Sequence, residues 1–171
     1  MYFRKEWNNT GVPRARLFTF RTYGSWLHED HRGSIDRNNN VFGDPYYPPH
    51  PEWERFRFKE LKSEPVKLTK RMRKAVIDSI EDTCKKRGWH LIAKNVRTNH
   101  VHSVINIGGT KPGLALNALK ANATRVLRER GLWPHEHSPW VSKGSKRPLW
   151  TEQDVDEAVD YVINGQGPNL D

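Results

Sequence analysis

The stretch of residues 67–131 constrains the fold most, because helix and strand patterns follow one another there with hardly any linker. Residues 67–88 carry apolar side chains at i, i+3 and i+4 spacing, which is typical of a helix with one buried face. Two runs rich in β-branched residues, 89–96 and 100–107, follow and are separated only by a short turn. A second amphipathic helix pattern covers 114–131. The order helix, strand, strand, helix predicts an antiparallel hairpin flanked by two helices.

The flanks of this stretch complete the predicted fold. Residues 14–23 have the β-branched and aromatic content of a strand, and Thr151 opens a C-terminal helix with acidic residues in its first turn. We expect an α+β fold, with an antiparallel sheet and helices packed on one face. One domain spans 1–171, with a loop-rich insertion at about 24–66. The segment 132–150 has no regular pattern and is expected to be irregular.

The charge balance points to an anionic partner. The chain has 29 Lys and Arg against 20 Asp and Glu, a net charge of +9, which commonly marks proteins that bind nucleic acid. Its single cysteine, Cys84, excludes an internal disulfide and a cysteine-rich zinc site. No apolar run reaches the ~20 residues that span a membrane, and the N-terminal residues lack the apolar core of a signal peptide. We therefore expect a cytoplasmic protein without a membrane segment.

Two histidines, His100 and His102, lie two residues apart in the second strand of the hairpin. Strand side chains alternate between faces, so both imidazoles project from one face, about 6–7 Å apart along the chain. Such a pair is either a set of surface or hydrogen-bonded histidines or part of a metal site. The spacing alone leaves both interpretations open.

A tyrosine in the C-terminal helix, Tyr161, gives the histidines a potential chemical role. Taken alone, Tyr161 is more simply interpreted as a core or interface aromatic residue. With a divalent ion held by the histidines, however, its hydroxyl could attack a phosphodiester and form a covalent phosphotyrosine. That bond keeps the energy of the phosphodiester, so the strand could later be rejoined without ATP.

Three motifs resemble one known family. "NHVH" (99–102) matches the HUH motif of the HUH endonucleases, a bulky apolar residue between two histidines. The order, with this motif first and one tyrosine on a C-terminal helix, resembles the single-tyrosine transposases. "RPLWTEQDVDEAVDYVINGQG" is similar to the C-terminal segment of the REP-associated tyrosine transposases, and "TYGSWLHEDHRGSIDR" resembles the opening of a bacterial subgroup.

The resemblance implies a ferredoxin-like (RRM-like) fold and a metal-dependent endonuclease and strand transferase for single-stranded DNA. It implies Mg²⁺ or Mn²⁺ as cofactor, single-stranded or hairpin DNA as partner, and a 5′-phosphotyrosine intermediate. By the match of motifs, His100 and His102 are metal ligands and Tyr161 is the nucleophile. Monomer and homodimer both stay open.

The third metal ligand is where the sequence departs from the family pattern. In the family, a Gln or Asn about one turn after the tyrosine completes the site, but the i+4 position here is Gly165. Asn164 and Gln166 flank this glycine. We favour Gln166, because its longer side chain can reach around the end of the helix.

Three alternatives remain for the function. A domesticated relative could bind single-stranded or hairpin DNA without cutting it. A phosphoesterase could use water as the nucleophile, with Tyr161 in a structural role only. An RNA-binding protein of the RRM type fits least, because the expected aromatic pattern is absent from "VHSVINIG".

Seven basic residues are candidate DNA contacts, unless they are simply scattered solvated charges. They lie in the segments 14–37 and 132–150, where with the sheet face they could follow the backbone of one DNA strand. They are Arg14, Arg16, Arg21, Arg32, Lys143, Lys146 and Arg147.

Overall fold

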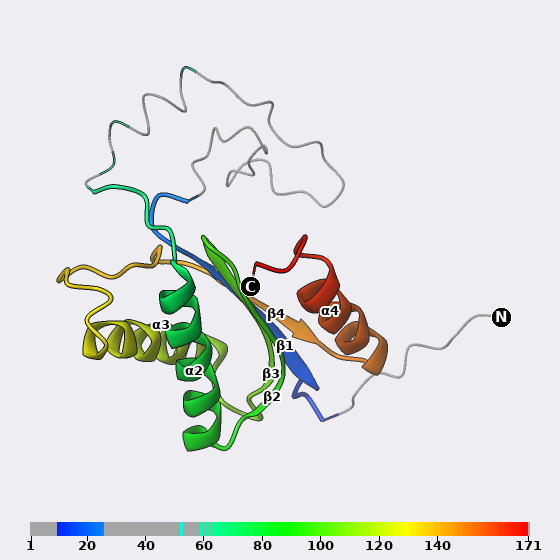
Figure 1. Ribbon diagram of the computed structural model, residues 1–171. Coiled ribbons are helices and arrows are strands. Elements are labelled where there is room, and N and C mark those ends of the chain that lie inside the picture. Colours follow the sequence, from blue (N-terminus) through cyan, green and yellow to red (C-terminus); the bar gives the residue numbers. More distant parts are fainter. Residues whose placement is uncertain (1–9, 26–51, 53–58, 60, 62, 171) are drawn as a thin grey trace.

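The computed structural model describes residues 10–25, 52, 59, 61 and 63–170, and Figure 1 gives its ribbon. Most of the expected insertion at 24–66 and the candidate DNA contact Arg32 lie outside the described residues. The elements, in chain order, are β1 (Ala15–Arg21), α2 (Lys70–Arg87), β2 (His90–Val96), β3 (His100–Asn106), α3 (Pro112–Glu129), β4 (Ser145–Leu149) and α4 (Glu152–Asn164).

The four strands form one sheet in the order β2-β3-β1-β4, and every neighbouring pair is antiparallel. Because α2 connects β1 to β2 and α3 connects β3 to β4, each helix crosses between strands that are not neighbours in the sheet. This βαββαβ arrangement is the ferredoxin-like fold. The predicted α+β class and antiparallel sheet are confirmed.

The helix α2 forms where the apolar pattern predicts it. Thr69 caps its start by accepting a hydrogen bond from the backbone N–H of Met72, and Gly88 ends it in a left-handed conformation with φ of 67°. The predicted apolar stripe, Met72, Ala75, Val76, Ser79, Ile80 and Cys84, is buried throughout. Among the described residues, no helix combines the length and apolar character needed to cross a bilayer.

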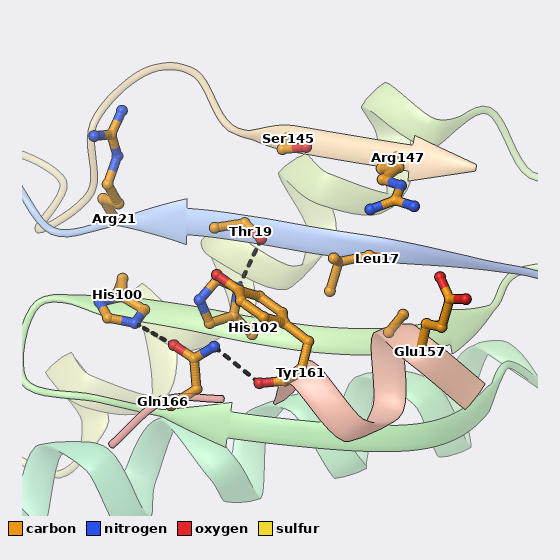
Figure 2. Close-up of a pocket in the computed structure, with 11 residues that line it drawn as sticks. Leu17, Thr19, Arg21, His100, His102, Ser145, Arg147, Glu157, Tyr161 and Gln166 are labelled. Carbon is orange, nitrogen blue, oxygen red and sulfur yellow. Dashed lines mark hydrogen bonds between the residues drawn. The ribbon is translucent and has the colours of Figure 1, made fainter. Parts of the chain in front are cut away.

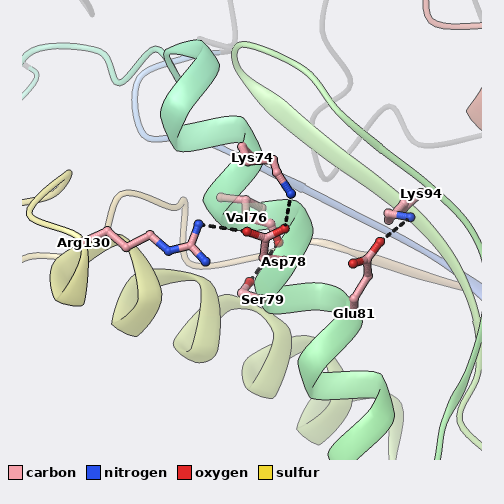
Figure 3. Close-up of polar contacts among 7 residues, drawn as sticks. All are labelled: Lys74, Val76, Asp78, Ser79, Glu81, Lys94 and Arg130. Carbon is pink, nitrogen blue, oxygen red and sulfur yellow. Dashed lines mark hydrogen bonds and ion pairs between the residues drawn. The ribbon is translucent and has the colours of Figure 1, made fainter.

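The main core lies between the sheet and the pair α2 and α3. Phe18 and Phe20 of β1 and Ile105 of β3 are buried there against both helices. At the surface, Asp78 of α2 accepts hydrogen bonds from Lys74 at 2.7 Å and from Arg130 at 2.9 Å, and Arg130 follows α3 (Figure 3). The half-buried Lys94 of β2 contacts Glu81 of α2 at 2.8 Å. The ion pairs with Arg130 and Lys94 join α2 to the end of α3 and to β2 at the margin of the core.

The last helix, α4, corrects the expectation that the helices pack on one face. It covers the opposite face of the sheet (Figure 1), where Ala158 and Val162 pack on a second, smaller core. Both central strands carry apolar residues on this face, Leu17 on β1 and Val104 on β3. A second layer is therefore needed to remove that end of the sheet from water.

The strand β4 was missed in the segment predicted to be irregular. Its sequence, SKRPL, has no alternating apolar pattern, and only Leu149 is buried. The strand lies at the edge of the sheet and pairs with β1 alone, which is where Pro148 can be tolerated. The strand β4 forms because it pairs with β1, so its own composition does not predict it.

Thr151 provides a test of how α4 is held. Its side chain accepts from the backbone N–H of Asp154, and the Asp154 carboxylate accepts from the backbone N–H groups of Thr151 and Trp150. We expect Thr151→Ala to lower the free energy of unfolding by about 1 kcal/mol in urea denaturation. The exposed Ser142→Ala should stay within about 0.5 kcal/mol of the parent protein. Equal midpoints for the two variants would contradict this role.

Candidate active site

The pairing of β1 with β3 places the two histidines on the face of the sheet that α4 covers only in part. His102 lies opposite Thr19 and His100 opposite Arg21, while Val104, two residues further along, is buried under α4. Beyond the end of α4 the sheet face is open, which leaves a cleft of about 580 Å³ (Figure 2). The cleft is lined by Leu17, Thr19, Arg21, His100, His102, Ser145, Arg147, Glu157, Ala158, Tyr161 and Gln166.

The structure brings both histidines and Tyr161 into one cluster of rings. The centroids of His100 and His102 are 4.8 Å apart, and those of His102 and Tyr161 are 5.3 Å apart, both edge to face. Figure 2 shows the Tyr161 ring extending from α4 across His102. Tyr161 is 47% exposed, so a ligand in the cleft can reach it.

Both ring nitrogens of His100 face an amide oxygen, one of Asn99 and one of Gln166. The side-chain oxygen of Asn99 lies 2.7 Å from Nδ1 of His100, and an amide oxygen can only accept, so Nδ1 carries a proton. In the neutral ring Nε2 then carries a lone pair, and the side-chain oxygen of Gln166 lies 3.1 Å from it. Two acceptors that face each other require a proton or a cation between them.

His102 is held in its neutral form by its surroundings. The side chain is buried, and its Nδ1 lies 2.8 Å from the hydroxyl of Thr19. Burial and then the proximity of His100 lower its pKa to about 4, against a smaller opposing effect of a hydrogen bond with Gln166. A neutral imidazole is the form that binds metal ions.

Of the two candidates for the third ligand, only Gln166 lies in the cleft. Its Nε2 donates to the backbone carbonyl of Tyr161 at 3.0 Å, and its oxygen turns toward His100 (Figure 2). Asn164 is exposed and donates to Asp160 at 2.7 Å. Gly165 allows this turn, since a Cβ there would lie 2.7 Å from the Tyr161 carbonyl oxygen.

The donor groups of the cleft fit a divalent metal ion with two imidazole ligands and one amide oxygen. No group of three or more His, Cys, Asp and Glu side chains that could hold a metal occurs in the described part of the chain. A metal ion bound in this cleft would be held by His100, His102 and the oxygen of Gln166, which lies 3.1 Å from Nε2 of His100. The amide oxygen and the open coordination positions suit Mg²⁺ or Mn²⁺, whereas the two imidazoles are ligands that transition-metal ions prefer.

Two of the seven candidate DNA contacts line the cleft. Arg21 lies beside the histidines on β1, and Arg147 lies opposite Leu17 on β4. Both flank the open side of the cleft in Figure 2.

The other described candidates lie away from the cleft. Lys146 pairs with Phe18, so it belongs to the other face of the sheet, and the Arg16 guanidinium donates to its carbonyl at 3.1 Å. Arg14 lies 3.7 Å from Glu152 at the start of α4. Lys143 is exposed in the segment before β4.

Sequence reasoning missed four polar residues of the site. Thr19 and Ser145 reach the cleft through strand pairing that a single strand does not reveal. Asn99 directly precedes His100, and its contact with that ring is local. Glu157 could have been found, because it precedes Tyr161 by four residues and so shares its helix face.

The comparisons with known proteins identify the family. The model of the family described as "Transposase IS200 like" matches residues 61–153, slightly more than half of the chain. The chain therefore belongs to the IS200-like transposase family. The matched segment contains His100 and His102 and ends before Tyr161. A search of proteins of curated function gives no match.

Two solved structures share the fold. One is a REP-associated tyrosine transposase bound to a REP hairpin, at 12% identity and a TM-score of 0.52, covering 95% of this chain and 70% of that one. The other is a protein of Deinococcus radiodurans described as a transposase, at 13% identity and a TM-score of 0.50, covering 96% of this chain and 100% of that one. At this identity the likeness concerns the fold.

The lowered pKa of His102 predicts a dependence of stability on pH. Between the unfolded pKa of 6.5 and the folded value of about 4, the unfolded chain binds the proton and the folded chain does not. Stability should therefore fall by about 1–3 kcal/mol as the pH decreases from 7 to 4.5 without metal, since each pKa unit corresponds to about 1.4 kcal/mol. Urea denaturation at several pH values measures this.

His102→Gln isolates this contribution from that of other groups. The variant should lose most of the pH dependence, whereas His90→Gln, on the exposed side of β2, should keep it. The same slope in all three proteins would contradict the assignment.

Proposed function

We propose that this protein is a metal-dependent endonuclease and strand transferase for single-stranded DNA, with Tyr161 as its nucleophile. One observation carries the proposal: the Tyr161 ring lies 5.3 Å from the His102 ring, in a cleft that also contains His100 and two arginines. Membership of the IS200-like transposase family supports a role in DNA processing. The whole chain, 1–171, would act as one catalytic domain.

The residues that would hold Mg²⁺ or Mn²⁺ are His100, His102 and Gln166. Such an ion, when bound, would polarise the scissile phosphate and offset the negative charge that develops on it. Thr19 and Asn99 would each fix the orientation of one histidine ring through its Nδ1. Both Nε2 atoms, together with the Gln166 oxygen that lies 3.1 Å from Nε2 of His100, would then face the ion.

The reaction itself is a transfer of a phosphodiester to tyrosine. The Tyr161 oxygen forms a bond to phosphorus and gives up its proton, while the bond between phosphorus and the 3′-oxygen breaks. The 3′-oxygen leaves with the electron pair and takes a proton, so a free 3′-hydroxyl and a 5′-phosphotyrosine result. Arg21 and Arg147 would hold neighbouring phosphates by charge-assisted hydrogen bonds.

The substrate class follows from the shape and charge of the cleft. It opens along the sheet face between α4 and β4, with arginines at its margin and apolar Leu17 and Ala158 in its lining. An unpaired strand can bring a phosphate to Tyr161 while its bases contact the apolar part. The neighbour solved with a REP hairpin supports single-stranded or hairpin DNA as the partner.

Trapping of the covalent adduct tests the nucleophile. We expect the parent protein with Mn²⁺ and a pool of 5′-labelled and 3′-labelled single-stranded DNA to form an adduct that survives denaturation and retains only the 3′-side label. Tyr161→Phe should abolish the adduct and leave DNA affinity and folding within about twofold, because it removes only the attacking oxygen.

Tyr23→Phe serves as the matched control, because it removes a hydroxyl outside the cleft. EDTA and His100→Ala should both suppress the adduct. An adduct that persists in Tyr161→Phe would exclude the mechanism. Tight binding of hairpin DNA with no adduct in the parent protein would favour the DNA-binding alternative.

The arginines at the cleft predict a second, independent result. Affinity for single-stranded DNA should fall steeply between 50 and 200 mM salt, as counterion release requires. Arg147→Gln should reduce the slope of log Kd against log salt by about 0.7, the value for one phosphate contact on a single strand. Arg125→Gln on α3, where Arg125 contacts Glu129, should leave the slope unchanged. Equal slopes for the parent and Arg147→Gln would remove Arg147 from the interface.

A further inference from the structure

The C-terminal end of α4 is held by residues of the β2–β3 hairpin. The last carbonyls of a helix have no partner within the helix and need one from elsewhere. Asn95 of β2 supplies one: its side-chain N–H donates to the carbonyl of Val162 at 2.8 Å. Asn95 lies opposite His102 in the pairing of β2 with β3. The Asn95 side chain thus links the sheet, at the position paired with His102, to Val162, the residue directly after Tyr161.

The segment after α4 is held by a second residue of the hairpin. Arg97, in the turn between β2 and β3, donates from its guanidinium to the carbonyl of Pro168 at 2.9 Å. Its backbone N–H donates to the carbonyl of His100 at 2.8 Å, so its main chain is fixed relative to the histidine strand. Gln166 lies two residues before Pro168. Arg97 therefore ties the segment that carries Gln166 to the strand that carries His100.

The apolar contacts of α4 do not by themselves fix its position along the sheet. Ala158 and Val162 are the buried residues of this helix, and both present small aliphatic groups to the core. Contacts of this kind favour burial but have little directional preference. Hydrogen bonds, in contrast, are directional and fix the positions of the atoms that they join. This matters because a displacement of about 1 Å is enough to slow a reaction strongly.

From these contacts we propose that Asn95 and Arg97 are positioning residues of the active site. Asn95 sets the position of Tyr161 through the end of α4, and Arg97 sets the position of Gln166 through the segment that follows. Neither side chain lines the cleft. The inference rests on the proposed function and adds to it how the nucleophile and the third ligand are held on the same chain as the histidines.

The two residues have different expected effects. Asn95→Ala should lower the rate of adduct formation at saturating DNA and Mn²⁺ by about tenfold to a hundredfold, with little change in the Mn²⁺ concentration for half-maximal rate. Arg97→Ala should instead raise that Mn²⁺ concentration by about tenfold, because the segment that carries Gln166 loses its hydrogen bond to the hairpin. Arg97→Lys keeps a donor and the charge, and should restore most of the parent behaviour.

Lys94→Ala is the matched control. Lys94 precedes Asn95 on the same strand, but its side chain faces α2 and pairs with Glu81 (Figure 3). This variant removes a cation from the hairpin without touching α4, so its adduct rate and its Mn²⁺ dependence should equal those of the parent protein.

Hydrogen exchange of backbone amides tests the same contacts without any catalysis. In Asn95→Ala and Arg97→Ala, amides of residues 162–167 should exchange at least tenfold faster, and those of 155–158 should not. If exchange changes as expected while the parent protein forms no adduct, the positioning holds and the proposed function fails. Unchanged exchange in both variants would overturn the positioning role, and so would an effect of Arg97→Ala confined to DNA affinity.

Discussion

The pairing register of β1 with β3 is the constraint on which the site depends. It sets Thr19 opposite His102 and Arg21 opposite His100, on the face of the sheet that α4 covers in part. A slip by one residue would turn both histidines toward α2 and α3 and bring Val101 and Ser103 to the cleft. Such a slip is opposed by the core, because Val101 and Ile105 of β3 would lose their burial against α2 and α3 at the same time.

Because α4 covers the sheet only in part, β3 contributes residues both to the core and to the candidate active site. Along one face of β3, Val104 is buried under the helix, His102 lies at its edge and His100 lies beyond it. The decrease in burial from Val104 to His100 distinguishes the two histidines. Burial keeps His102 neutral, while the more accessible His100 faces the amide of Gln166.

Local periodicity explains what the sequence could predict. The alternation of strand side chains placed His100 and His102 on one face, and helical spacing predicted the buried stripe of α2. The parts that escaped prediction depend on partners far away in the chain. The strand β4 is formed by pairing with β1, and the face chosen by α4 follows from apolar residues of two distant strands. The contact of Asn95 with Val162 bridges 67 positions, and no local pattern encodes it.

The departure from the family pattern at Gly165 has a local explanation in the end of α4. The carbonyl of Tyr161 accepts two hydrogen bonds, from the backbone N–H of Gly165 and from Nε2 of Gln166, both at 3.0 Å. With its Nε2 donating there, the amide of Gln166 presents its oxygen to Nε2 of His100 at 3.1 Å. A side chain at position 165 would crowd both the carbonyl and the ring of Tyr161. The backbone of the candidate nucleophile thus orients the candidate third ligand, and the amide approaches His100 from position i+5 relative to Tyr161.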